Sequence, residues 1–469
     1  MPPAVSPPIL LISALLLLGG CWLPGPDFRR PTPEVEARWQ AALPHEGSLV
    51  RLADWWTHFD DPLLPRLIAR AEAGHPNLEK ALASLAEARA GVASATATGL
   101  PVVNTGASLA RGGEAGNSAL PATTNRKVSL DASWELGLFG SVQRAMEVAT
   151  AQMAAREESW HQARITLAAE VAARYVDYRS CRRLVGNLEE ELTSRRTTRE
   201  VVGKAVAAGL RAAAEAELAR AVVAEGESQR TAQEMECELA LKALVALSGL
   251  EETTLREWLA EPAPPLPAPE RFAVTTLPAA LPSQRPDLAA AEHELAAASA
   301  AIGYAEAQRY PRFSLTGSIG LRHADFKGQS PEFRPWSFGP SLSLPLFDAG
   351  ARQAQVDAAT ARYQQALAAY RLAVRLAIRE VEEALTRLDA ATRRAGAAQT
   401  AADGQKAFFL ATLEHYRQGG ADLLRVEETR RNAGQAERNR LLLEREQVQQ
   451  WIALYKALGG GWERRDDTP

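Results

Sequence analysis

The chain repeats itself at a nearly constant spacing, and this duplication limits the fold to one built from two copies of a single unit. The matching positions lie 208–210 residues apart: His75-Pro76-Asn77-Leu78 with Arg285-Pro286-Asp287-Leu288, Pro101 with Pro311, Leu138-Phe139-Gly140 with Leu346-Phe347-Asp348, and Gly209 with Gly419. Each copy reads as helix, extended hairpin, long helix, turn and helix. A chance match in an alanine-rich chain is the alternative, but the shared order of the anchors favours a true repeat.

The duplication predicts a first repeat at residues 51–260 and a second at 287–460. The linker between them, residues 261–286, opens with the proline-rich run Glu261–Pro269, which we expect to be stiff and extended. Residues 21–50 form an N-terminal linker, and residues 461–469 form a C-terminal tail.

Four segments alternate apolar and polar side chains with a period of two, which is typical of strands that have one apolar and one polar face. They lie in two hairpins at about residues 100–137 and 311–347, and the clearest runs are Val128–Leu136, Phe313–Leu321 and Trp336–Leu344. Each run has about 9–11 residues, enough for a tilted transmembrane strand. The alternative is a small soluble sheet with one buried face.

Transmembrane strands have to close into a barrel because lipid offers no hydrogen-bond partner to an open edge. One chain supplies four strands, whereas single-chain bacterial barrels begin at about eight. Two chains would give eight strands around an interior filled by side chains. Three chains would give twelve strands, which can leave a lumen lined by the polar faces. Oligomerisation is therefore expected in either case.

Residues Gly140–Val202 contain no proline and keep a helical pattern, and about 60 residues at 1.5 Å each rise about 90 Å. Apolar residues recur every seven positions at Val171, Tyr178, Val185 and Leu192, with Cys181 and Leu188 beside them. The last helix repeats this pattern at Leu441, Val448 and Tyr455, with Trp451 and Leu458 beside them. These heptads predict that each long helix coils with a neighbour. An ordinary long-helix bundle is the alternative if the strands are misassigned.

Residues 1–20 carry no charged side chain, and Ile9–Leu18 form an apolar run that is typical of a signal peptide. The sequence Leu18-Gly19-Gly20-Cys21 resembles a bacterial lipobox, in which Cys21 receives a diacylglycerol and an N-acyl chain. The segment before it lacks Lys and Arg, so an ordinary signal peptide with a chance cysteine is the alternative. Residue Trp22 is not an aspartate, which by resemblance to lipoprotein sorting favours the outer membrane.

Several motifs occur in a fixed order along residues 21–462: Asp54–Leu64, Asn77–Ala81, Ala88–Ala90, Leu136–Gly140, Leu344–Gly350 and Tyr416–Leu424. Together with the duplication, they resemble TolC-like outer-membrane efflux proteins of the NodT lipoprotein type. The resemblance implies a mainly α fold with transmembrane β structure. Each chain of a homotrimer would contribute four strands to a twelve-stranded β-barrel, which a barrel of long helices continues across the periplasm.

The resemblance also implies a function and partners. Such proteins are passive channels that dock a periplasmic adaptor and an inner-membrane transporter, commonly of the RND class, and export drugs, metals or other small molecules. The protein is then expected to be lipid-anchored in the outer membrane of a bacterial cell and to extend into the periplasm. Its only non-protein group would be the lipid on Cys21.

The resemblance places Gly209 and Gly419 at turns of the periplasmic tip, where acidic and hydrogen-bonding side chains narrow the channel into a gate. Asp422 and Glu428 match positions that often carry carboxylates, whereas Arg425 stands where an acid is common and Glu427 where an apolar residue is common. An Arg425–Glu428 pair, three residues apart on a helix, would offset part of the repulsion between like charges. The alternative is that these are solvated charges on a helix face.

Two cysteines lie symmetrically about the first turn, because Cys181 is 28 residues before Gly209 and Cys237 is 28 residues after it. If Gly209 marks the turn of an antiparallel helix pair, both cysteines lie at one level. The periplasm is oxidising, so a disulfide is a reasonable expectation. Two buried free thiols are the alternative.

The sequence gives little support for catalysis or for nucleic-acid binding. Apolar residues make up 46% and charged residues 23%, and the mean hydropathy of −0.20 argues against a polytopic helical membrane protein. The net charge of −4 argues against a basic face for nucleic acid. The seven histidines are scattered, and His293-Glu294 lacks the second histidine of a zinc-protease helix. We expect no enzyme, no cofactor beyond the lipid and no metal site. The alternatives to an efflux duct are the outer channel of a type I protein-secretion system and a coiled-helix lipoprotein scaffold.

Overall fold

The computed structural model describes residues 23–462 except 33–34, 45–51, 60, 114–121, 262–265, 267–270, 275–277 and 326–330. The predicted signal peptide, Cys21, most of the Glu261–Pro269 run and residues 463–469 therefore lie outside the described residues. The chain divides into two compact units. Unit 1 comprises residues 1–32, 83–157 and 290–371, and unit 2 comprises residues 33–82, 158–289 and 372–469. Each unit draws on both sequence repeats.

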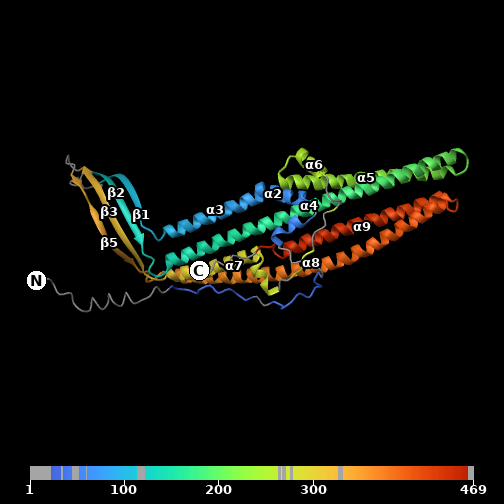
Figure 1. Ribbon diagram of the computed structural model, residues 1–469. Helices are drawn as coiled ribbons and strands as arrows, with labels where there is room; N and C mark the ends of the chain where they lie inside the picture. The colour runs from blue at the N-terminus through green and yellow to red at the C-terminus, as the bar shows by residue number, and fades with distance from the viewer. Residues whose placement is uncertain are drawn as a thin grey trace. The chain divides into compact units, whose positions relative to one another are not determined.

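The elements follow the predicted order twice (Figure 1). The first copy contains η1 (Leu52–His58), α2 (Leu63–Gly74), α3 (Pro76–Ala97), β1 (Val102–Gly112), β2 (Thr123–Glu135), α4 (Ser141–Ala207), α5 (Ala213–Ser248) and α6 (Glu252–Ala260). The second contains η2 (Pro278–Ser283), α7 (Pro286–Ala307), β3 (Arg312–Asp325), β4 (Glu332–Phe333), β5 (Trp336–Ser343), α8 (Ala351–Arg417) and α9 (Leu423–Ala457). Helices α4 and α8 each have 67 residues, so the two copies match in length as well as in order.

Unit 1 holds one antiparallel sheet in which β1 pairs with β2, β2 with β3, and β3 with both β5 and the two-residue β4. Strand β4 was not predicted, because two residues are too short to show an alternating pattern. Directly paired residues share a face, and the register aligns Leu130 with Ile319 and Ile319 with Trp336. The apolar sets of all four long strands therefore lie on one face, which confirms the predicted alternation.

The apolar face of this sheet is exposed in the single chain. Trp336 and Phe338 are 78% and 72% exposed, and Ile319, Leu321, Val128 and Leu130 are also exposed. The other face is polar and internally bonded. Asp131 of β2 accepts hydrogen bonds from Ser129 Oγ at 2.9 Å and from Ser318 Oγ of β3 at 2.6 Å. A sheet with such faces differs from one that covers a soluble core, where the apolar face is buried.

Unit 2 has its own core, and the Asp54–Leu64 signature supplies much of it. Trp55 is fully buried, stacks on Tyr455 of α9 with ring centroids 5.1 Å apart, and meets Phe272 edge-on at 5.3 Å. Trp56 donates a hydrogen bond from its indole Nε1 to the Tyr455 hydroxyl at 3.2 Å. The signature thus packs the start of the first repeat against the end of the second.

The heptad positions predicted on α4 and α9 are mostly buried, as expected of coiled helices. Tyr178 is the exception, since it is only half-buried, whereas Tyr175 three residues earlier is fully buried. The predicted members that are buried are Val171, Cys181, Val185, Leu188, Leu192, Leu441, Val448, Trp451, Tyr455 and Leu458.

None of the helices in the described ranges is both long enough and apolar enough to cross a bilayer.

Candidate functional site

The two helix pairs of unit 2 turn at glycines, as the sequence predicts. Helix α4 ends before Gly209 (φ 73°) and α8 ends before Gly419 (φ 79°), a left-handed conformation that glycine adopts without strain. At the first turn Leu210 N donates to Ala205 O, and at the second Gly420 N donates to His415 O, both at 2.9 Å. This is the Schellman pattern, which satisfies the last carbonyls of each helix.

The helices that leave the two turns begin differently. Asp422 is the N-cap of α9, and its side chain accepts a hydrogen bond from Arg425 N at 2.8 Å. Ala212 takes the same place at α5 and has no side-chain oxygen to offer. Asp422 therefore stabilises the start of α9 in addition to any role as a charge at the tip.

Arg425 and Glu428 form the ion pair that their spacing predicts. The guanidinium Nη1 lies 2.7 Å from Glu428 Oε2, and both side chains are half exposed. The Arg425 guanidinium also lies 5.6 Å from the ring centroid of Phe408 on α8. The exposed charges at this turn are thus two carboxylates, the cap Asp422 and Glu428, and one guanidinium, Arg425, which offsets one of the two negative charges.

Glu427 differs from the other three predicted gate residues because it is buried, with 5% of its surface exposed. Its carboxylate accepts a hydrogen bond from Ser194 Oγ of α4 at 2.9 Å and lies 3.4 Å from Arg430 Nη1. Arg430 also donates to Ser194 Oγ and lies over the ring of Phe409. The carboxylate therefore joins α9 to α4 within the chain, although the family resemblance made Glu427 a gate candidate at a position that is often apolar.

A second buried carboxylate makes similar contacts three residues from Ser194, about one turn along α4. Glu191 of α4 accepts hydrogen bonds from Arg195 and from Arg438 of α9. Burial acts to raise the pKa of Glu191, but the hydrogen bonds from the two guanidinium groups outweigh it, so the pKa lies below its ordinary value. The α4–α9 contact is consequently held by ion pairs as well as by apolar packing, which the heptad pattern alone does not reveal.

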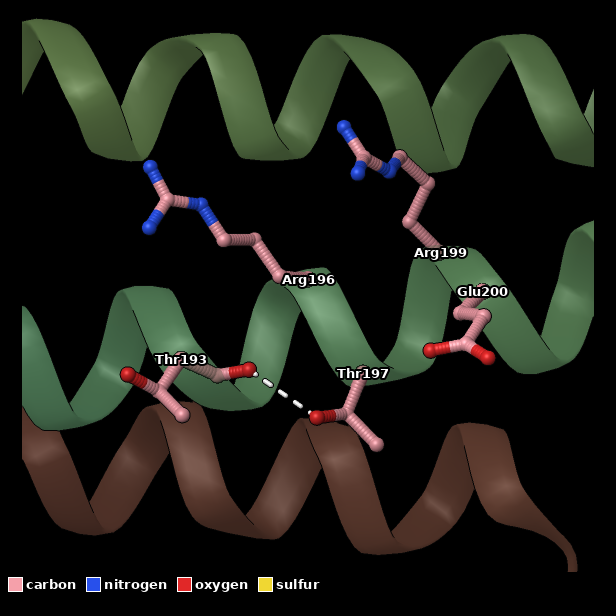
Figure 2. A pocket seen from close by; sticks show the side chains of 5 residues that line it. All are labelled: Thr193, Arg196, Thr197, Arg199 and Glu200. Carbon is pink, nitrogen blue, oxygen red and sulfur yellow. Dashed lines mark hydrogen bonds between the residues drawn. The ribbon is translucent and has the colours of Figure 1, made fainter.

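A shallow pocket of about 630 Å³ opens on α4 near this level (Figure 2). It is lined by Thr193, Arg196, Thr197, Arg199 and Glu200, and Thr197 Oγ1 donates to the Thr193 carbonyl at 3.1 Å. All five residues are exposed, and Arg196 pairs with Glu227 of α5 at 2.8 Å. Such a surface lacks the enclosed, mostly apolar lining of a small-molecule site. In the part of the chain that the structure describes, no group of three or more His, Cys, Asp or Glu could hold a metal.

The structure joins Cys181 of α4 and Cys237 of α5 by a disulfide, with the two Cα atoms 5.4 Å apart. Both residues are buried beside Val185. The bridge closes a loop across 56 positions that contains the first helix turn. The two cysteines therefore do lie at one level of an antiparallel pair, as their equal distance from Gly209 predicts.

Comparison with known proteins agrees with this architecture. The family model of the outer membrane efflux protein matches residues 67–250 and again 277–460. This chain belongs to the outer membrane efflux protein family. The double match also agrees with the internal repeat and with the NodT-type resemblance of the motifs.

The relatives cover nearly the whole chain. Outer membrane protein OprJ of Pseudomonas aeruginosa is 31% identical over 97% of this chain and 97% of its own length. Nodulation protein T of Rhizobium leguminosarum bv. viciae is 29% identical over 95% of this chain and 92% of its own. Among solved structures, the MtrE outer membrane channel of Neisseria gonorrhoeae in its open state is 27% identical, has a TM-score of 0.81, and matches 95% of this chain and 99% of MtrE.

The sequence did not reveal every residue that organises this efflux-family chain. It missed Arg144, a buried arginine in the first turns of α4, and the bonded pair of Asp61 and Tyr175 in unit 2. Arg144 was detectable in principle as a charge beside Val142, Ala145 and Met146 at the start of a long helix. Cys21, the predicted lipidation site, lies outside the described residues, so its lipidation stays a prediction.

Proposed function

We propose that this protein is the outer-membrane channel of a tripartite efflux system and conducts small molecules passively to the cell exterior. The observation that carries the proposal is the two-faced sheet, which turns an apolar face outward and a hydrogen-bonded polar face to the other side. A lipid-facing strand needs such an exposed apolar face, and a water-filled lumen needs such a polar one. The role is that of a duct, with no catalytic step.

A homotrimer is the assembly that completes this sheet. Strands β1 and β5 form its two edges, and edge strands in lipid have to be paired. Pairing β1 of one copy with β5 of the next closes a ring, and three copies give twelve strands around an open lumen, whereas two would give about eight around a filled one. The long helices of three copies would then continue the duct through the periplasm.

The partners of the proposed channel follow from its family. We expect a periplasmic adaptor and an inner-membrane transporter of the RND class to deliver drugs, metals or other small molecules to the channel. Asp422, Arg425 and Glu428 are exposed and are the candidates for the gate. Glu427 is bonded within its own protomer, so we assign it to holding α9 on α4.

Lipidation of Cys21 would add an anchor in the outer membrane to the strands. The lipobox-like sequence supports it, and intact-mass spectrometry of the detergent-extracted protein tests it. An acylated N-terminus adds about 0.8 kcal/mol of membrane affinity per buried CH₂ group.

The test of the proposed channel is the oligomeric state and conductance of the detergent-extracted, full-length protein. We expect a trimer that gives discrete conductance steps in planar bilayers. A monomer without conductance would contradict the proposal and favour a coiled-helix scaffold. Deletion of the gene separates the two channel types, because an efflux duct predicts increased drug sensitivity and a type I secretion channel predicts loss of a secreted protein.

A further inference from the structure

The first described residues of the chain, 23–32, run along unit 1 as an extended segment, which we call the N-terminal strap. The strap begins at the return between β2 and α4, since a methyl group built on Gly140 would lie 2.7 Å from Leu23 Cδ2. It then follows α7, because Gly25 lies against Gly303 and Arg30 Nε lies 2.8 Å from Glu292 Oε1. It therefore passes from the end of the sheet along the helix that precedes β3.

Two glycines allow the strap to approach α7 at backbone distance. A methyl group on Gly25 would lie 2.4 Å from Gly303 Cα, and one on Gly303 would lie 2.7 Å from the Pro24 carbonyl oxygen. Gly25 also has a φ of 84°, which other residues adopt only with strain. No side chain larger than hydrogen fits at either position without moving the strap.

Arg144 of α4 binds the strap at this crossing. Its side chain is 3% exposed and donates hydrogen bonds to the Pro24 carbonyl at 3.2 Å and to Asp27 Oδ1 at 2.9 Å. Its remaining donors reach the Gly25 carbonyl at 3.5 Å and Glu147 Oε2 at 2.7 Å. A buried guanidinium is costly unless it is paired, so these contacts make the strap part of the folded unit.

We propose that Arg144 is a positioning residue for the membrane anchor: it holds the segment that carries Cys21 against the return between β2 and α4. Cys21 is two residues before Leu23 in the sequence, and two residues of extended chain span at most about 7 Å. The return is where the apolar strand face ends, so an acyl chain attached there enters lipid at the edge of the sheet. This inference rests on the proposed lipidation of Cys21.

The experiment uses the full-length protein with a nitroxide label on Arg29→Cys, an exposed strap position outside the clamp. The sequence has three cysteines, so with Cys21 acylated and Cys181 bridged to Cys237 the label finds a single thiol. We expect an immobilised spectrum in the parent. The mobile fraction should rise about tenfold in Arg144→Met, which removes the charge-assisted hydrogen bonds, and in Gly25→Val, which clashes with α7.

Arg156→Met is the matched control, because Arg156 lies on the same helix and forms an exposed ion pair with Glu294 at 3.3 Å. It should leave the label immobilised. A label that stays immobilised in Arg144→Met and Gly25→Val, or that is already mobile in the parent, overturns the proposal. Gly25→Val decides if Arg144→Met fails to fold, because Gly25 belongs to the strap alone.

Two further measurements keep this inference separate from the channel proposal. Intact mass of the labelled samples reports acylation, and a clamped strap with unmodified Cys21 would refute the anchoring role. Conductance of the parent tests the channel by itself. If the variants release the strap and the parent forms a conducting trimer, both proposals are supported. If the variants release the strap but the parent does not conduct, only the clamp is supported.

Discussion

At the scale of single residues, the family signature near the N-terminus serves the fold. Asp61 is 1% exposed, accepts a hydrogen bond from Leu63 N at 3.0 Å and from the Tyr175 hydroxyl at 2.5 Å, and lies 4.0 Å from Arg179 Nε. Burial and the neighbouring carboxylate raise the pKa of Tyr175 well above its ordinary value, so its hydroxyl stays protonated and donates. The carboxylate thereby fixes the start of α2 on α4.

Replacing Tyr175 by phenylalanine should therefore destabilise unit 2. The change removes a hydrogen bond to a buried carboxylate, and we expect a loss of about 1–3 kcal/mol in the free energy of unfolding. Denaturant titration of the detergent-solubilised protein measures it. Tyr178→Phe, at a half-buried position of the same helix, is the control, and equal effects of the two changes would show that the Asp61 contact contributes nothing.

Asp177 gives a prediction about how stability depends on pH. Burial raises its pKa above the ordinary value of 3.8 more than Arg445 and Arg174 lower it. A raised pKa means that the folded state binds the proton more tightly, so its contribution to stability is present at low pH and is lost as pH rises through the folded pKa. Asp177→Asn should raise the melting temperature at about pH 7.5, and the gain should shrink toward about pH 4.

Asp403→Asn, at an exposed site of α8, is the control for that series. Melting curves of both variants and the parent at matched salt give the comparison. A gain from Asp177→Asn that stays constant from neutral to acid pH would show that the buried charge is not its cause.

At the scale of elements, much of the fold was accessible from sequence because glycines and periodicity mark it. Gly209 and Gly419 predicted both helix turns, and the alternation of apolar and polar residues predicted the two faces of the sheet. The features that the sequence did not predict depend on tertiary contacts. The burial of Glu427 depends on Ser194, and the clamp at Arg144 depends on Gly25, each more than 100 residues away in the chain. Local patterns carry no information about such distant partners.

The turn glycines give a prediction for the ends of the helix pairs. Gly419→Ala places a side chain at φ 79°, which costs about 1–2 kcal/mol. Amide hydrogens in the last turn of α8 should then exchange about 5–30 times faster, as measured by mass spectrometry. Gly404→Ala is the control, because this exposed position lies within α8, where alanine is favoured. Unchanged exchange at the turn in Gly419→Ala would contradict the left-handed conformation.

The bridge between α4 and α5 gives a prediction for the other helix pair. Exchanging both Cys181 and Cys237 for serine removes a loop constraint, which in the chain-entropy account costs up to about 4 kcal/mol. We expect a lower melting temperature and faster exchange along α5. Chemical reduction of the parent should reproduce both effects. Recovery of two free thiols by non-reducing peptide mapping would instead rule out the bridge in the mature protein.

At the scale of the whole molecule, the two faces of the sheet decide where the protein can reside. Phe338→Lys places a charge on the apolar face, and in a lipid-facing strand this costs about 2–4 kcal/mol. Ser337→Lys changes the neighbouring residue on the polar face and should be tolerated. The amount of trimer in isolated outer membranes measures the difference. Equal amounts of both variants would mean that the apolar face does not contact lipid.

The open edges of that sheet also bear on how the protein is made. Until the proposed trimer forms, a newly exported copy exposes an apolar sheet face and two edge strands with unpaired backbone amides, and such edges are templates for aggregation. We therefore expect the protein to need a chaperone that covers the sheet during export, and its abundance to depend on how fast the proposed trimer assembles compared with proteolysis.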